Sequence, residues 1–148
     1  MSAAIHFPLE ELTFSQVALR KGLPNVPNME QIANLTRLRD TLLEPGRLLI
    51  PVPWHVDSGF RSPEVNAAVG GAQNSAHMEG RAADVIPKGV MLREAFDLLR
   101  HSALPYDQII FECEAWIHLA IAREGQEPRR QALLAQGKPG DWHYYPVA

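Results

Sequence analysis

The sequence predicts an α+β fold in a single domain. Two observations carry this prediction: apolar residues at helical spacing dominate the early part of the chain, and short apolar runs of strand length alternate with helical segments after it. Helices followed by a mixture of short strands and helices are typical of the α+β class. The chain has 148 residues, of which 46% are hydrophobic and 21% charged, so it is long enough to bury one core. We therefore expect residues 1–148 to form one domain.

The early part of the chain predicts two helices. Thr13 and Gln16 have the spacing of a capping box, and Gly22 is a typical residue just after a helix end. Asn28 and Gln31 form a second capping box. The apolar residues that follow recur at helical spacing: Ile32, Leu35, Leu38 and Leu42. We expect these helices to be scaffold whose apolar stripe packs on a sheet.

The middle of the chain predicts a strand and a short helix. Pro45 is expected to end or kink the preceding helix, because proline lacks the N–H that a helix interior needs. Residues 55–59 are a candidate strand. Ser62 is a good N-cap and Pro63 a good first helical residue, so the next helix is predicted from Pro63 to about residue 69.

The second half of the chain predicts strands with one helix between them. Residues 82–86 predict a buried strand, and residues 91–100 an amphipathic helix. Two apolar runs, 107–111 and 116–122, are separated by a polar turn and predict a hairpin. The aromatic residues at 142–145 are interpreted as a tail that docks on the core, the alternatives being closure over a functional site or glycan binding.

Two histidines and one aspartate form the candidate metal site. Two imidazoles and one carboxylate are a ligand set of catalytic zinc, which keeps a fourth position open. His77 and Asp84 lie seven residues apart, with Gly80 and small residues between them that predict a tight turn into the buried strand. His118 would arrive from a second strand. We expect these three side chains to converge on one Zn²⁺ ion.

Several separated motifs occur along the chain in one order. The main ones are SGFRSPEVN at 58–66, the glycine pair at 70–71, the Ser-x-His-x-x-Gly-x-Ala-x-Asp run at 75–84, DQIIFE at 107–112 and WIH at 116–118. Together with weaker likeness at 34–45 and 128–131, they cover most of residues 10–134 and resemble the M15 zinc peptidases, in particular the short D-Ala-D-Ala carboxypeptidase-like branch common in phages and prophages. The resemblance implies a D-Ala-D-Ala carboxypeptidase/hedgehog-like fold, with helices flanking a small mixed or antiparallel sheet.

The resemblance also implies roles for Arg61 and Ser75. Arg61 matches the family arginine that points at the scissile carbonyl, with Phe60 in place of tyrosine; the alternative is a structural salt bridge at a helix start. Ser75 matches a family serine that contacts the substrate, and the alternative of equal weight is a local turn hydrogen bond.

The general base is the point at which this chain departs from its better-known relatives. They carry a carboxylate three residues before the last histidine, where this chain has Ala115. Glu112 and Glu114 are the nearby candidates. In one straight strand both share a face with His118; in a hairpin with a three-residue loop, Glu112 keeps that face and Glu114 moves to the turn tip. Glu112 is therefore favoured over Glu114 as the catalytic base.

Composition excludes several classes of partner. A formal net charge of −3 and the lack of a basic patch argue against nucleic acid. No apolar run is long enough to insert into a membrane, and the N-terminus lacks the basic start of a secretory signal. Cys113 has no second cysteine to pair with. We expect a monomer made in the cytoplasm that acts on the cell wall after release or as part of a virion.

The favoured function is that of a zinc-dependent peptidase acting on peptidoglycan stem peptides. A D-Ala-D-Ala carboxypeptidase or endopeptidase that serves lysis in a phage or prophage is the expected form. Ala115 motivates a second hypothesis, a catalytically silent zinc domain that binds the wall or a virion partner. A third hypothesis, a zinc enzyme for another amide, shares the same site.

Overall fold

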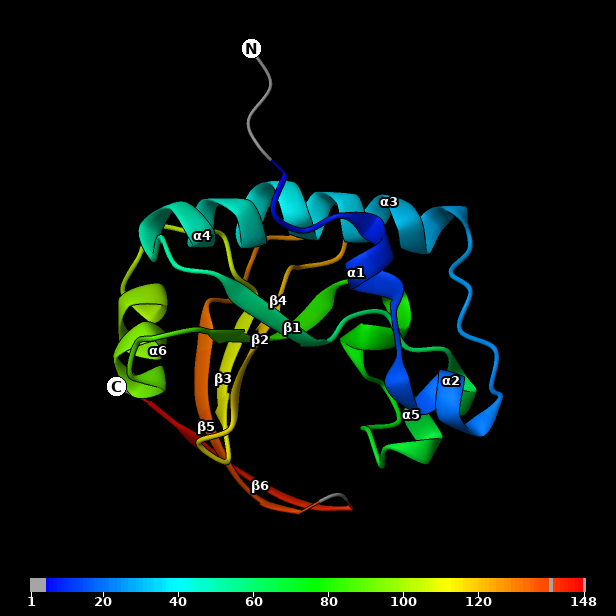
Figure 1. Ribbon diagram of the computed structural model, residues 1–148. Helices are drawn as coiled ribbons and strands as arrows, with labels where there is room; N and C mark the ends of the chain where they lie inside the picture. The colour runs from blue at the N-terminus through cyan, green and yellow to red at the C-terminus, as the bar shows by residue number, and fades with distance from the viewer. Residues whose placement is uncertain (1–4, 139, 148) are drawn as a thin grey trace.

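The computed structural model describes residues 5–138 and 140–147, which fold into helices around a mixed sheet (Figure 1). The helical elements are α1 (Leu9–Thr13), α2 (Gln16–Lys21), α3 (Met29–Leu38), the π-helical η1 (Arg39–Leu43), α4 (Glu44–Leu49), α5 (Pro63–Ala68), the 3₁₀ turn η2 (Ala76–Glu79) and α6 (Leu92–Arg100). The strands are β1 (Trp54–Ser58), β2 (Ala82–Pro87), β3 (Gln108–Glu112), β4 (Trp116–Ala120), β5 (Gln131–Lys138) and β6 (Asp141–Pro146). This confirms the predicted α+β class.

The six strands form one sheet in the order β1-β2-β4-β3-β5-β6. Four of the five pairings are antiparallel, and β3 with β5 is parallel. The predicted hairpin is β3–β4. The sheet is therefore mixed, and β2 and β4 lie side by side near its middle.

The cap of α2 differs from the predicted one. The Ser15 hydroxyl accepts a hydrogen bond from the Ala18 N–H, whereas the Thr13 hydroxyl donates to the Leu9 carbonyl at the end of α1. Thr13 therefore belongs to the preceding helix, and the predicted Thr13–Gln16 capping box is wrong. The end of α2 at Gly22 is confirmed by its left-handed φ of 65°.

The cap of α3 is the predicted one. The Asn28 side chain accepts from the Gln31 N–H, and the Gln31 side chain accepts in return from the Asn28 N–H. The N–H groups of Asn28 and Gln31 each gain a side-chain acceptor in this way.

Of the two outcomes predicted for Pro45, an end of the helix or a kink, the end does not occur. Helices α3 and α4 are joined by η1, and the three form one helical run across the top of Figure 1. The Glu44 N–H bonds to the Arg39 carbonyl, five residues back, so the helix widens by one residue just before the proline. This register change accommodates the proline ring without breaking the run.

No helix in the described residues is long and apolar enough to cross a membrane.

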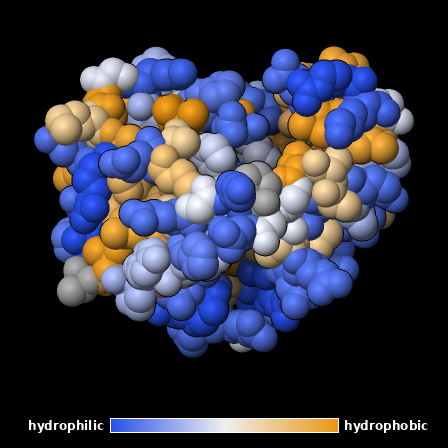
Figure 2. Space-filling model, turned by 90° about the horizontal axis from the view of Figure 1, so that it is seen from below, coloured by the Kyte–Doolittle hydropathy of each residue, from blue (hydrophilic) through white to orange (hydrophobic). Residues whose placement is uncertain are grey.

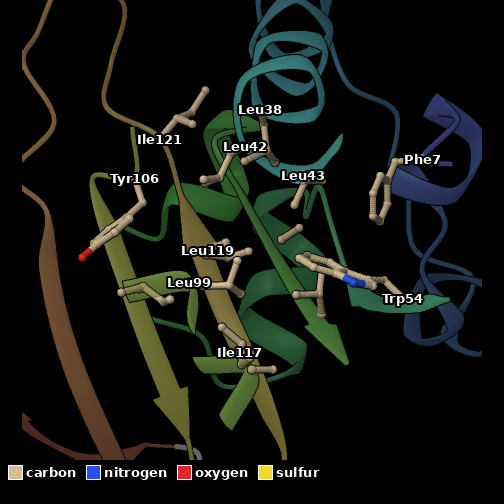
Figure 3. Packing of buried hydrophobic residues seen from close by; sticks show 14 of the residues in the cluster. Phe7, Leu38, Leu42, Leu43, Trp54, Leu99, Tyr106, Ile117, Leu119 and Ile121 are labelled. Carbon is tan, nitrogen blue, oxygen red and sulfur yellow. The ribbon is translucent and has the colours of Figure 1, made fainter. Parts of the chain in front are cut away.

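The core lies between the sheet and the helices that cover one of its faces. In Figure 3 the side chains of Leu38, Leu42 and Leu43 extend from the helical run toward the sheet, where Ile117 and Leu119 project from β4. All five are at most 1% exposed. Because successive side chains of a strand point to opposite faces, the burial of 117 and 119 in the core turns residue 118 to the other face.

Strands β5 and β6 replace the predicted aromatic tail. Residues 142–145 do not dock on the core; they form most of β6, the edge strand, which pairs with β5. Tyr144 and Tyr145 remain 47% and 50% exposed. The interpretation of this segment as a tail docked on the core is therefore wrong.

Candidate metal centre

The side chains of His77, Asp84 and His118 converge on the open face of the sheet. Asp84 Oδ1 lies 3.2 Å from His77 Nε2 and 3.0 Å from His118 Nδ1. One ligand atom from each residue lies within 4.8 Å of the others. The residues are only 2%, 2% and 6% exposed. The predicted convergence is thus present in the structure.

Strand pairing and one tight turn bring the three side chains together. Asp84 on β2 is directly opposite His118 on β4, so their side chains share a face. His77 lies on η2, and Gly80 turns the chain into β2 with a left-handed φ of 75°. A Cβ at Gly80 would lie 2.5 Å from the Gln31 carbonyl oxygen, so only glycine fits this turn against α3.

Hydrogen bonds orient both imidazoles. His77 Nδ1 lies 2.7 Å from the Gly59 carbonyl oxygen, which can only accept, so Nδ1 carries the proton and Nε2 faces Asp84. His118 presents Nδ1 to the same carboxylate. A histidine that ligates a metal is commonly held in this way, by a hydrogen bond from its other ring nitrogen to a backbone carbonyl.

The pKa directions in this cluster follow from burial and the shared carboxylate. Burial lowers the pKa of His77, which favours the neutral ring that a metal requires. Burial would raise the pKa of Asp84, but the charges and hydrogen bonds of His77 and His118 outweigh it and hold that pKa below its ordinary value. Burial would likewise lower the pKa of His118, yet the hydrogen bond and charge of Asp84 outweigh it and raise that pKa. A metal ion would compete with the His118 proton.

The donor set and its spacing fit a tetrahedral metal. Ligand atoms about 2.0 Å from a tetrahedral zinc stand roughly 3.3 Å apart. The separations of 3.2 and 3.0 Å between Asp84 Oδ1 and the two ring nitrogens are close to that value. Two nitrogens and one oxygen from protein leave a fourth position open.

The β3–β4 turn separates the two candidate bases. Glu112 pairs with Trp116, so residues 113–115 form a three-residue loop, and Glu114 lies in it with a left-handed φ of 56°. Glu112 Oε1 lies 4.0 Å from His118 Nδ1, while its Oε2 accepts from Trp116 Nε1 at 2.9 Å. Of the two glutamates, only Glu112 lies beside the cluster. Burial and the charge of Asp84 raise its pKa.

Arg61 adjoins the cluster through the second oxygen of Asp84. Its Nη2 lies 3.2 Å from Asp84 Oδ2, and its side chain is 14% exposed. Nε donates to the Ser58 hydroxyl and Nη1 to Asn66 Oδ1. Arg61 thus forms the ion pair of the alternative interpretation, and its predicted role toward a substrate carbonyl stays a prediction. Sequence reasoning missed Ser58 and Asn66, although both lie in the motif at 58–66.

Ser75 makes the local turn hydrogen bond that was the alternative to substrate contact. Its hydroxyl accepts from the His77 N–H at 3.2 Å and caps η2. The same residue lines the groove described next, so the two roles are compatible in space.

A groove of about 760 Å³ runs over the cluster. It lies between α2 and α5 on one side and the β5–β6 hairpin on the other (Figure 1). Phe14 lines it near α2, and Trp142 and Tyr144 line it from β6. Seen from below, the outline of the molecule is notched between two lobes (Figure 2). The place of these two aromatics beside the groove agrees with the alternative in which the segment lies over the functional site, not with docking on the core.

Comparison with known proteins identifies the family. No curated protein matches the chain. The family model described as Peptidase M15 matches residues 5–120, a range that includes the three clustered side chains, Arg61 and Glu112. Strands β5 and β6 lie beyond the matched range. Since the match covers most of the chain, this chain belongs to the Peptidase M15 family.

Proposed function

We propose that the protein is a zinc-dependent peptidase that hydrolyses peptide bonds in peptidoglycan stem peptides. The observation that carries the proposal is the position of Glu112, whose carboxylate lies 4.0 Å from a histidine of the metal-binding cluster in a chain of the Peptidase M15 family. D-Ala-D-Ala carboxypeptidase or endopeptidase activity, serving lysis in a phage or prophage, is the form we favour.

His77, Asp84 and His118 are the proposed zinc ligands. When bound, zinc supplies a Lewis acid that polarises a peptide carbonyl and activates water at neutral pH. The chain's own contribution is the burial of the three ligands and the Gly59 carbonyl that fixes the ring of His77. Both keep the ligand atoms oriented before any substrate arrives.

Glu112 is the proposed general base. A base must reach the attacking water, accept its proton and pass a proton to the leaving amine. Glu112 Oε2 is held by Trp116 Nε1, while Oε1 is the oxygen nearer His118.

Arg61 and Ser75 are the proposed substrate contacts. A guanidinium carries five N–H donors, and Arg61 uses three of them in the bonds to Ser58, Asn66 and Asp84. Its remaining donors are available to the oxygen that becomes negative when the carbonyl is attacked. The Ser75 hydroxyl caps η2 as an acceptor, which leaves its own O–H free to donate to a peptide carbonyl.

The groove suits an extended peptide with small side chains. Ile110, Leu133 and Ala135 form a small apolar cluster apart from the main core, and Ile110 is directly opposite His118. Ile110 and Leu133 line the groove next to Glu112. A short aliphatic side chain beside the scissile bond would find an apolar surface there.

The test is digestion of purified peptidoglycan with and without a chelator, followed by mass spectrometry of the released ends. The proposal predicts new peptide ends that appear only when the metal is present. Digestion that chelator does not affect would contradict it.

A second candidate is a silent zinc domain that binds the cell wall or a virion partner. Ala115, in the β3–β4 loop, favours it because a carboxylate of better-known relatives is missing at that position. This candidate predicts that the wild type and a Glu112→Gln variant bind peptidoglycan equally and release nothing.

A further inference from the structure

The guanidinium of Arg61 is held from three sides by groups that do not act on substrate themselves. Its three hydrogen bonds measure 3.0 Å from Nε to Ser58 Oγ, 3.1 Å from Nη1 to Asn66 Oδ1 and 3.2 Å from Nη2 to Asp84 Oδ2. Each nitrogen therefore has one partner, so both the position and the rotation of the planar group are determined. Without the Asn66 bond, Nη1 would lose its partner, and only the Ser58 and Asp84 bonds would hold the direction of the free donors.

Asn66 is a buried bridge between Arg61 and the loop after α5. It is 4% exposed, and its Nδ2 donates to the Ala72 carbonyl at 2.8 Å while its Oδ1 accepts from Arg61. The Ala72 bond fixes which end of the amide is the oxygen, so the oxygen must face the guanidinium. Asn66 thus links the loop at 70–72 to the Arg61 side chain.

Gly71 packs directly against the Asn66–Arg61 hydrogen bond. A Cβ at Gly71 would lie 2.1 Å from Asn66 Oδ1 and 2.9 Å from Arg61 Nη1. Its φ is outside the left-handed region, so an alanine here meets no backbone strain. The nearest obstacle to a side chain is therefore the Asn66–Arg61 pair. A Gly71→Ala variant must displace that pair while keeping every hydrogen-bonding group.

We propose that Asn66, backed by Gly71, is a positioning residue that aims the free N–H groups of Arg61 at the substrate carbonyl. The inference rests on the proposed peptidase function, because the effect of Asn66 on Arg61 is expected to change kcat. It adds the loop at 70–72 to the parts of the chain on which that function depends.

The test compares Asn66→Ala and Gly71→Ala with the wild type. Both variants should bind as much zinc as the wild type and have a similar KM, while kcat falls by about 10- to 100-fold, the scale of a misplacement of about 1 Å. Nitrogen-15 NMR of the Arg61 guanidinium gives a second readout. We expect separate Nη signals in the wild type and faster exchange between them in Asn66→Ala, because two hydrogen bonds instead of three then restrain the rotation.

Asn34→Ala is the matched control. Asn34 also donates to a backbone carbonyl, that of Glu79, and also accepts from an arginine, Arg37, but it does not contact Arg61. Its loss should lower the melting temperature and leave kcat unchanged.

The outcomes separate the inference from the function on which it rests. A wild type that hydrolyses peptidoglycan beside variants with unchanged kcat and unchanged Arg61 signals overturns the positioning role alone. A wild type with no hydrolysis overturns the proposed function, and the inference with it. If Asn66→Ala does not fold, Gly71→Ala decides by the same two readouts.

Discussion

The surroundings of Glu112 disfavour its ionised form, and its carboxylate lies beside the candidate metal site. It is half-buried beside Asp84, which carries the same charge, and both effects raise its pKa. The Trp116 N–H holds one oxygen, so the other has a defined direction. At the scale of single residues, the identity of the proposed base is the first question to test, because two glutamates, Glu112 and Glu114, lie at the β3–β4 turn.

Replacing each glutamate by glutamine should separate the two candidates. Glu112→Gln keeps size and hydrogen bonding but removes basicity, so it should retain zinc and lose on the order of 10²–10⁴ in turnover. Glu114→Gln should be nearly silent, because Glu114 lies in the turn and does not line the groove. Steady-state rates on a purified muropeptide, with metal content measured on the same samples, are the readout. An inactive Glu114→Gln beside an active Glu112→Gln would reverse the assignment.

Removing the Arg61 guanidinium should affect turnover much more than metal binding. Arg61→Ala loses the donors proposed for the developing negative charge, so turnover should fall by about 10²–10³. Asp84 keeps both histidine partners, and zinc content should therefore stay near that of the wild type. Thermal melts of the same preparations supply the control. A variant that unfolds or loses its zinc would favour a purely structural ion pair for Arg61.

At the scale of elements, the features that the sequence predicts well are those that a few neighbouring residues determine. The Asn28 capping box, the helix start at Ser62 and the β3–β4 hairpin are confirmed. The hairpin is the alternative with a three-residue loop, and this geometry is what brings Glu112 rather than Glu114 to the cluster. Such features depend on contacts within a few residues, so the sequence pattern is sufficient to find them.

Some features were missed although they are local, and others because they depend on distant contacts. Thr13 ends α1 instead of capping α2, and a π-helical turn that the pattern does not announce precedes Pro45. Strand β5 pairs in parallel with β3, a partner more than 20 residues earlier, and β6 depends on β5. The hydrogen bonds of Asn66 and Ser58 to Arg61 were missed for the same reason, because side-chain geometry is not visible in a motif.

An ion pair joins the starts of β3 and β5 and should make stability depend on pH. Burial would raise the pKa of Asp107, but the hydrogen bonds and charge of Arg129 outweigh it and hold that pKa below its ordinary value. A lowered folded-state pKa means that the contribution is complete above the ordinary carboxyl pKa of about 3.9 and is lost as the pH falls through the lower folded value.

Asp107→Asn should therefore lower the free energy of unfolding by about 1 kcal/mol near neutral pH. In acid, the difference from the wild type should shrink, because the wild-type carboxylate is then protonated as well. Urea unfolding at several pH values measures this difference directly. A difference that stays constant with pH would mean that the Asp107 charge is not what stabilises the strand pair.

At the scale of the whole molecule, the fold separates packing from chemistry across one sheet. One face carries the apolar core under the helical run, and the other carries the His-Asp-His cluster, Arg61 and Glu112 in an open groove. Strand β4 contributes to both faces, since Ile117 and Leu119 enter the core while His118 faces the groove. The groove is bordered on one side by β6, which lies beyond the range that the family model matches.

Zinc titration into metal-free protein tests the central claim most directly, with bound metal and released peptide ends recorded on the same samples. The account predicts that both rise together and saturate at about one zinc per chain. Glu112→Gln should follow the metal curve without releasing peptide, and His77→Ala and His118→Ala should lose both. Full zinc binding by the two histidine variants, or hydrolysis by the metal-free wild type, would contradict the account.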